Sequence, residues 1–222
     1  MLKWVLWTPL PTMQVTGSNR TDEQTKIVST RLLLSGHDFL MAASVVSEHK
    51  EGQAEGEVID ATVCFDTPKT MLVPEALYSP EMNRVYMAVN DLMLGDDECV
   101  VVASKDGVVA LTAVDKRINT LLSNLENWTV RYTSPLLEGI VGYARAVRIT
   151  LTDENSYVVV SDHGRLLYAE AFATTDPDNL LFVMNKLREV LSLKGCEVRV
   201  SGSGASATAE RLTELFADCK AL

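Results

Sequence analysis

The sequence contains no apolar run close to the roughly 20 residues that a membrane-spanning helix needs. The N-terminal stretch Met1–Trp7 is apolar, but Pro9 and Pro11 follow at once, so it lacks the continuous apolar segment of a signal peptide. We therefore expect a protein that does not insert into membranes and that resides in the cytoplasm.

Cysteine and basic residues are also scarce. Four cysteines occur, none in a C-x-x-C pair, and Cys64 and Cys99 lie within apolar stretches. Such cysteines behave as small core side chains, so no disulfide framework is expected and a reducing compartment fits. The chain has 20 basic and 30 acidic residues, a formal net charge of −10. This surplus argues against binding to nucleic acid or anionic lipid.

The motifs of several common chemistries are missing. The sequence has no P-loop, no G-x-S-x-G and no H-E-x-x-H. His37, His49 and His163 are the three histidines, and they are too far apart in sequence to form a helical i, i+4 pair of ligands. We therefore assign no catalytic residue and no metal ligand, and favour a protein that is not an enzyme.

Two segments show a hairpin pattern and resemble each other. Arg31–Val46 has an apolar strand, the turn Ser35–Asp38 and a second apolar run. Tyr157–Phe172 repeats this order around the turn Ser161–Gly164, and the two segments align without gaps. Because helices and strands are predicted after each of them, the sequence favours two related halves.

The other segments alternate between strand and helix patterns. Strands are predicted over residues 58–65, 70–73, 99–103, 108–114, 129–132 and 196–200. Helices are predicted over residues 75–78, 82–94, 115–126 with Asp115 as N-cap, 136–147, 176–191 and 208–216. The result is an α/β protein with mixed sheets flanked by helices. We expect two halves, residues 1–148 and 149–222, with a boundary near Ala146 to Glu154.

Three stretches, Met71–Tyr78, Leu111–Asp115 and Tyr157–Gly202, carry a family resemblance. Over Lys69–Leu222 the chain is similar to an uncharacterised bacterial family, found in Bacteroidetes, that is grouped with the actin-like ATPases. PilM, a pilus-assembly protein, resembles it more distantly. The resemblance implies the duplicated, ribonuclease-H-like fold of actin, sugar kinases and heat-shock chaperones, in two subdomains. It implies no particular activity.

In active members of that superfamily, two hairpin turns hold the nucleotide phosphates, normally with an acidic residue and glycines. The resemblance therefore implies Asp38 in the first turn, and Asp162 and Gly164 in the second, as cofactor-binding candidates. Neither turn has the full D-x-G-x-x-x-T pattern. Phe39 and Arg165 also occupy positions where small residues would help phosphate to approach.

The loop Gly202–Gly204 lies between a predicted strand and a predicted helix. It matches G-x-G-x-x-A, but the dinucleotide fingerprint also requires a second strand and an acidic residue at a set distance, and neither follows. In actin-like proteins a glycine-rich loop at this place lies against the adenosine, which implies Gly202 and Gly204 as nucleotide contacts. A tightly packed strand-to-helix loop is the alternative.

Trp4 and Trp7 lie on the apolar N-terminal segment, ahead of a polar loop over residues 9–26. We expect this segment to pair with a sheet edge of its own chain, with pairing in a homodimer as the alternative. The sequence favours a non-catalytic or weakly nucleotide-binding scaffold, a pseudo-ATPase that contacts a protein partner or a second copy and needs no cofactor. The alternatives are an ATPase or kinase-like enzyme that binds ATP and Mg²⁺, and a dimeric structural protein without a ligand.

Overall fold

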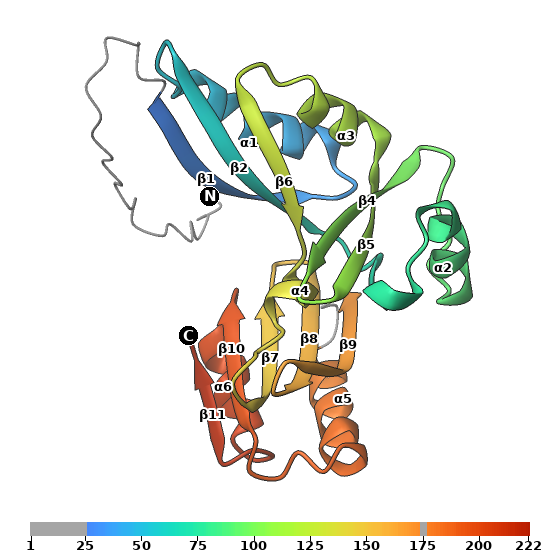
Figure 1. Cartoon of the computed structure of the whole chain (residues 1–222). Helices are drawn as coiled ribbons and strands as arrows, with labels where there is room; N and C mark the ends of the chain where they lie inside the picture. The colour runs from blue at the N-terminus through green and yellow to red at the C-terminus, as the bar shows by residue number, and fades with distance from the viewer. Residues whose placement is uncertain (1–25, 174–176) are drawn as a thin grey trace, which may run out of the picture.

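The computed structural model describes residues 26–173 and 177–222, which form three β-sheets flanked by helices (Figure 1). The first sheet is parallel, with β1 at Lys26–Ser35, β2 at Glu57–Asp66 and β6 at Trp128–Thr133 in the order β1-β2-β6. Helices α1 (Phe39–Glu51) and α3 (Lys116–Ser123) pack against it and bury its apolar side chains in a common core.

The second sheet is antiparallel, with the order β3-β5-β4. It consists of β3 (Thr70–Pro74), β4 (Glu98–Lys105) and β5 (Val108–Asp115). The strands predicted over residues 99–103 and 108–114 are confirmed as β4 and β5, and they pair as a hairpin. Asp106 and Gly107 have φ of 52° and 78°, as a two-residue turn of type I′ requires.

Between β3 and β4 the chain forms two 3₁₀ turns, η1 (Glu75–Leu77) and η2 (Pro80–Met82), and the short helix α2 (Asn83–Val89). Met87 is fully buried and attaches α2 to the second sheet. The helix is shorter than predicted, because Asp91 adopts a positive φ of 59° soon after Val89. Figure 1 shows α2 at the outer edge of the molecule.

The third sheet has five strands in the order β11-β10-β7-β8-β9. β7 (Arg145–Leu151), β8 (Asn155–Asp162) and β9 (Arg165–Ala173) form an antiparallel meander, which confirms the predicted second hairpin. β10 (Glu197–Gly202) and β11 (Asp218–Ala221) continue the sheet in parallel on the other side of β7. The central strand of this sheet is therefore β7.

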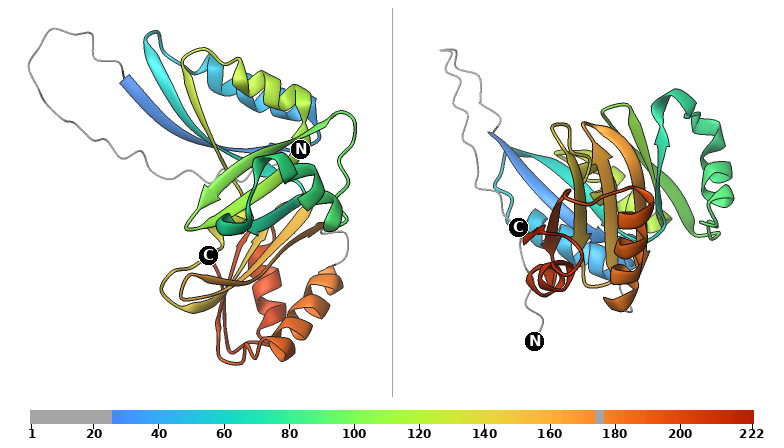
Figure 2. Two further views of the ribbon diagram at one scale, coloured as in Figure 1. Left: turned by 45° about the vertical axis from the view of Figure 1, so that its right-hand side comes forward. Right: turned by 90° about the horizontal axis from the view of Figure 1, so that it is seen from below.

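Helices lie against both faces of the third sheet. On one face, α5 (Pro177–Val190) and α6 (Ala205–Leu212) share a core with the strands, and the left view of Figure 2 shows both helices on this side. On the other face, α4 (Pro135–Glu138) packs with Tyr157 and Val159 of β8. The fully buried side chains of α4 thus connect the third sheet to the rest of the chain.

The first predicted hairpin is wrong. The segment after the turn is helix α1, and not a strand that returns beside β1. Asp38 caps the helix, since its Oδ1 accepts the N–H of Met41 at 3.0 Å. Ala42 and Val46, four residues apart, are buried on one side of α1. The two hairpin-like segments therefore share an apolar pattern but not a structure.

Two further elements differ from the prediction. The helix expected over residues 136–147 ends at Glu138, Gly139 and Gly142 follow, and β7 begins soon afterwards. The strand β11 was not predicted. The mixed α/β class is confirmed. The division near residues 146–154 stays a prediction, and the N-terminal tryptophans lie outside the described residues.

Candidate functional site

The carboxyl ends of β1 and β2 face the turn between β7 and β8, which spans residues 152–154. Parallel strands present their carboxyl ends at one edge of a sheet, and this edge is where α/β proteins place most of their ligand sites. Here β1 ends at Ser35 and β2 at Asp66, and the two residues are partners in register. This junction between the first and third sheets is the candidate functional site.

Asp66 is the centre of the junction. Its Oδ1 accepts three hydrogen bonds from side chains of the third sheet and its turn: from Thr152 Oγ1 at 2.9 Å, Asn155 Nδ2 at 2.7 Å and Tyr157 OH at 2.8 Å. The Tyr157 hydroxyl also accepts the N–H of Thr67 at 2.7 Å. We call these five residues the Asp66 cluster.

The protonation state of Tyr157 suits this role. The side chain is only 1% exposed, and burial, together with the Asp66 charge, raises the pKa of Tyr157 well above its usual range. The hydroxyl therefore stays neutral and remains a hydrogen-bond donor. Because two buried donors, Asn155 and Tyr157, come from β8 and the third, Thr152, comes from the facing turn, the carboxylate joins the two sheets directly.

Backbone contacts hold the turn that follows β1, residues 35–38 (the β1 turn), against the Asp66 cluster. The Gly36 N–H donates to the Asp66 carbonyl at 3.0 Å, and the Gly36 carbonyl accepts the Asp115 N–H at 2.8 Å. A Cβ at Gly36 would lie 2.9 Å from the Cβ of Thr67, so the approach requires glycine. His37 Nε2 lies 3.5 Å from Glu154 Oε2, which adds a further contact across the junction.

Asp115 is almost completely buried beside this turn and confirms the predicted N-cap of α3. Its side chain accepts the N–H of Arg117 at 2.7 Å and also pairs with the Arg117 guanidinium. The hydrogen bond from the Arg117 side chain lowers the pKa of Asp115, against the opposing effect of burial. The guanidinium carbon lies 5.0 Å from the centre of the Phe39 ring, so this cation is already held by two partners.

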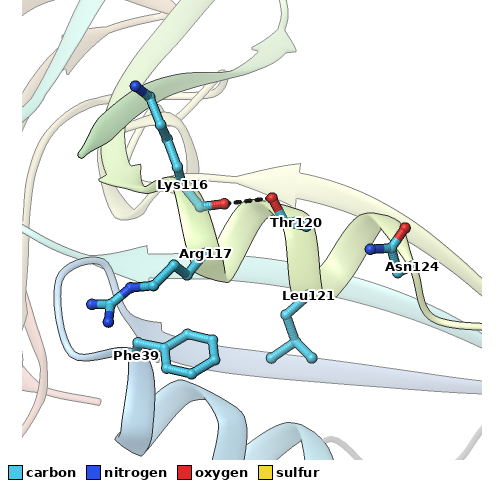
Figure 3. Close-up of a pocket in the computed structure, with 6 residues that line it drawn as sticks. All are labelled: Phe39, Lys116, Arg117, Thr120, Leu121 and Asn124. Atoms are coloured by element: carbon cyan, nitrogen blue, oxygen red, sulfur yellow. Dashed lines mark hydrogen bonds between the residues drawn. The ribbon is translucent and has the colours of Figure 1, made fainter. Parts of the chain in front are cut away.

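A hollow of about 410 Å³ lies between α1 and α3 (Figure 3). It is lined by Phe39, Lys116, Arg117, Thr120, Leu121 and Asn124. The ammonium of Lys116 donates to the Asp96 carbonyl at 2.6 Å, and Figure 3 shows this side chain extending away from Phe39 and Leu121, which lie side by side between the two helices. Both cations have protein partners, so this hollow is poorly equipped to hold a phosphate.

The structure separates the predicted site residues into two groups. Asp38 caps α1 beside the junction, and Gly202 ends β10 next to Leu151, at the same end of the third sheet as the β7–β8 turn. Asp162 and Gly164 lie at the opposite end, where Asp162 is in register with Arg145. The length of β7, seven residues, puts about 20 Å between the two ends.

The two glycines of the other loop have conformational reasons to be glycine. Gly202 has a φ of 93°, and a Cβ there would lie 1.9 Å from the carbonyl oxygen of Leu151. Gly204 has a φ of 69° and caps α6. These constraints explain both residues by backbone packing, and their nucleotide contacts stay a prediction.

Sequence reasoning missed the β7–β8 turn. The β8–β9 turn was favoured as the phosphate-binding hairpin because its segment repeats Arg31–Val46, while the helix predicted over residues 136–147 covered the start of the strand Arg145–Leu151. The alternation and the β-branched residues of this segment are a strand signal. A strand there would have placed Asp153 and Glu154 in the turn that faces the first sheet.

Residues 26–173 and 177–222 contain no group of three or more His, Cys, Asp or Glu side chains placed to hold a metal ion. Nor does this part of the chain contain a helix long and apolar enough to cross a membrane.

Comparison with known proteins places the chain in a family. Residues 41–218 match the family described as "Protein of unknown function (DUF3822)". The chain belongs to this family. No curated protein matches it.

Similar solved structures show the fold of this family member. A Bacteroides thetaiotaomicron protein with an actin-like ATPase fold and unknown function has a TM-score of 0.64 and 13% identity, over 82% of this chain and 76% of that one. The chain therefore has the actin-like ATPase fold, as the sequence predicted. The PilM–PilN type IV pilus biogenesis complex has a TM-score of 0.46 and 14% identity, over 80% of this chain and 74% of that one. The AlfA filament bound to AMPPNP has a TM-score of 0.37 and 11% identity, over 82% and 58%.

Proposed function

We propose that this protein is a non-catalytic scaffold of the actin-like fold that acts through contacts with other proteins. The observation that supports the proposal is the Asp66 cluster. An acidic side chain at the carboxyl end of β2 is well placed to hold a metal ion, but its Oδ1 here accepts three hydrogen bonds from the facing sheet and turn. The carboxylate is used to join two parts of the fold.

Phosphoryl transfer needs a positioned metal ion and a positioned phosphate together. A phosphate-binding turn usually supplies free backbone N–H groups from small residues. The β7–β8 turn, residues 152–154, contains no glycine, and the Asn155 N–H after it donates to Thr152 Oγ1 at 2.9 Å. Arg117, in the first turn of α3, is bound to Asp115 and lies over the Phe39 ring. These features favour a structural role for the junction.

The competing function is a Mg²⁺-dependent ATPase. The observation that favours it is the gathering of Asp38, Asp66, Glu154 and the Gly202–Gly204 loop at facing ends of the two sheets, the edge that α/β enzymes use for ligands. In this alternative a metal ion would bind Asp66 through Oδ2, because the three donors occupy Oδ1. A dimeric structural protein without a ligand is the remaining alternative.

Calorimetric titration with ATP and ADP, with and without Mg²⁺, distinguishes these functions. The scaffold predicts no binding heat at millimolar nucleotide and no phosphate release above buffer. Magnesium-dependent binding that Asp66→Asn abolishes would support the ATPase instead. Asp162→Asn is the matched control, because Asp162 lies at the opposite end of the third sheet and should leave any binding at the junction unchanged.

A further inference from the structure

The exposed side of α2 and its flanking turns carries a concentration of apolar side chains. Five large ones are exposed within residues 77–93, and we call them the α2 patch: Leu77, Met82, Val85, Val89 and Met93. The other side of α2 is an ordinary core face, since Met87 is fully buried against the second sheet. The helix is therefore apolar towards both the protein and the solvent.

A helix on a protein surface normally turns a polar face to water. Met82, Val85 and Val89 follow the spacing i, i+3, i+7, which places them along one stripe. Contiguous exposed apolar side chains of this kind mark contact surfaces. Figure 1 and the right view of Figure 2 both show α2 at the periphery, away from α5 and α6, where a second molecule has room to approach.

The charges at the two ends of α2 indicate which molecule fits. Arg84 lies in the first turn and Asp91 just beyond the last, and both are exposed. Within the described parts of the chain, neither side chain forms an ion pair or a hydrogen bond. A second α2 laid antiparallel would bring Arg84 of each copy near Asp91 of the other. A parallel α2 would bring like charges together.

We propose that two copies of this chain dimerise through an antiparallel pair of α2 helices. The two-fold axis passes between the helices, so each contact occurs twice and the α2 patch covers itself, as in an isologous interface. Val85 of one copy packs beside Val89 of the other, and the two Arg84–Asp91 pairs at the rim fix the direction and register.

This dimer adds a partner to the proposed scaffold, namely a second copy of the chain. The dimer does not depend on the scaffold function. A monomeric protein would overturn the dimer and leave the nucleotide titration unaffected. Nucleotide binding, conversely, would overturn the scaffold and leave the α2 interface unaffected.

The interface is small. The seven residues of α2 extend about 10 Å, so the buried area falls at the low end of specific interfaces, below about 1,200 Å². We therefore expect a reversible dimer, and sedimentation equilibrium across a micromolar to high-micromolar series measures its dissociation constant. A single monomeric species throughout the series would overturn the proposal.

The apolar contact is tested by Val89→Asp. This change puts a carboxylate at the centre of the pair and should raise the dissociation constant at least about tenfold, as loss of a central contact does. Val190→Asp is the matched control, because both valines are in helices and both are 77% exposed. An equal effect of the two changes, or no effect of Val89→Asp, would show that the chains do not meet through α2.

The antiparallel direction is tested by mixing two charge variants. Arg84→Glu alone and Asp91→Lys alone each place like charges at both ends of the pair, so each should raise the dissociation constant about tenfold. An equimolar mixture restores opposite charges at both ends and should dimerise as well as the wild type. A mixture that stays as weakly associated as its components would exclude this register.

Discussion

Replacing Tyr157 with phenylalanine removes one hydroxyl and little else. The hydroxyl donates to Asp66 and accepts the N–H of Thr67. A hydrogen bond to a charged group contributes about 1.5–3 kcal/mol, and the change also leaves a buried N–H without its acceptor. We expect Tyr157→Phe to lower the free energy of unfolding by about 2–3 kcal/mol in urea titrations.

Asp66→Ala removes the shared acceptor of three donors and should cost about 3–4 kcal/mol, less than three separate bonds because the contributions are not additive. The double variant with Tyr157→Phe should then show a coupling energy of about 1–2 kcal/mol. Tyr143→Phe is the control. Its exposed hydroxyl only accepts from Arg148 at 3.2 Å, so its effect should stay within about 0.5 kcal/mol.

Alkaline pH supplies a second measurement on the same hydroxyl. The folded pKa of Tyr157 is raised, so stability is fully present below the unfolded pKa of about 10 and is lost as the pH rises above it. Tyr157→Phe should weaken this alkaline loss. Additive effects of Asp66→Ala and Tyr157→Phe, within about 0.5 kcal/mol, would refute the cluster as the connection between the sheets.

Two other changes test local features of the site. Gly202→Ala should lower the free energy of unfolding by about 3 kcal/mol, because the added methyl group meets a backbone carbonyl oxygen at 1.9 Å. The methyl group of Gly204→Ala meets nothing within 4 Å, so this change should cost only about 1–2 kcal/mol of backbone strain. Equal losses of the two variants in thermal or urea unfolding would contradict this. Asp115→Ala removes a helix cap and should cost about 0.5–2 kcal/mol at neutral pH. Because the folded pKa of Asp115 is lowered, its stabilisation is present above the unfolded pKa of about 3.9 and is lost as the pH falls through the lower folded value. The difference between wild type and Asp115→Ala should therefore shrink in acid, and a constant difference would contradict this.

Local signals in the sequence predicted much of the fold. Asp106-Gly107 specifies its hairpin because both positions need positive φ, and Asp115 before a run of apolar i, i+3, i+4 spacing specifies the start of α3. The failure at α1 has a physical cause. Its apolar and alanine residues fit either a strand or a helix, and the cap that Asp38 provides decides for the helix.

The candidate site was less predictable because it depends on contacts between distant segments. The three donors to Asp66 lie about 90 positions further along the chain, and nothing in the local sequence of Asp66 indicates them. The repeated turn pattern moved the expected site to Asp162, which lies at the end of the third sheet opposite the β7–β8 turn. A strand prediction for β7 would have identified the β7–β8 turn, but not the hydrogen bonds from this turn and β8 to Asp66.

Hydrogen–deuterium exchange with and without MgATP tests directly whether the junction is structural or binds nucleotide. It reports on both sides of the junction at once: the β1 turn at residues 35–38, the end of β2 at Asp66 and Thr67, and the β7–β8 turn at residues 152–154. If the junction is structural, exchange is slow at Thr67, whose N–H is bonded to Tyr157, and no site changes when MgATP is added at millimolar concentration. Protection that appears on both sides only with MgATP would contradict this expectation, and would show that the junction is a nucleotide site.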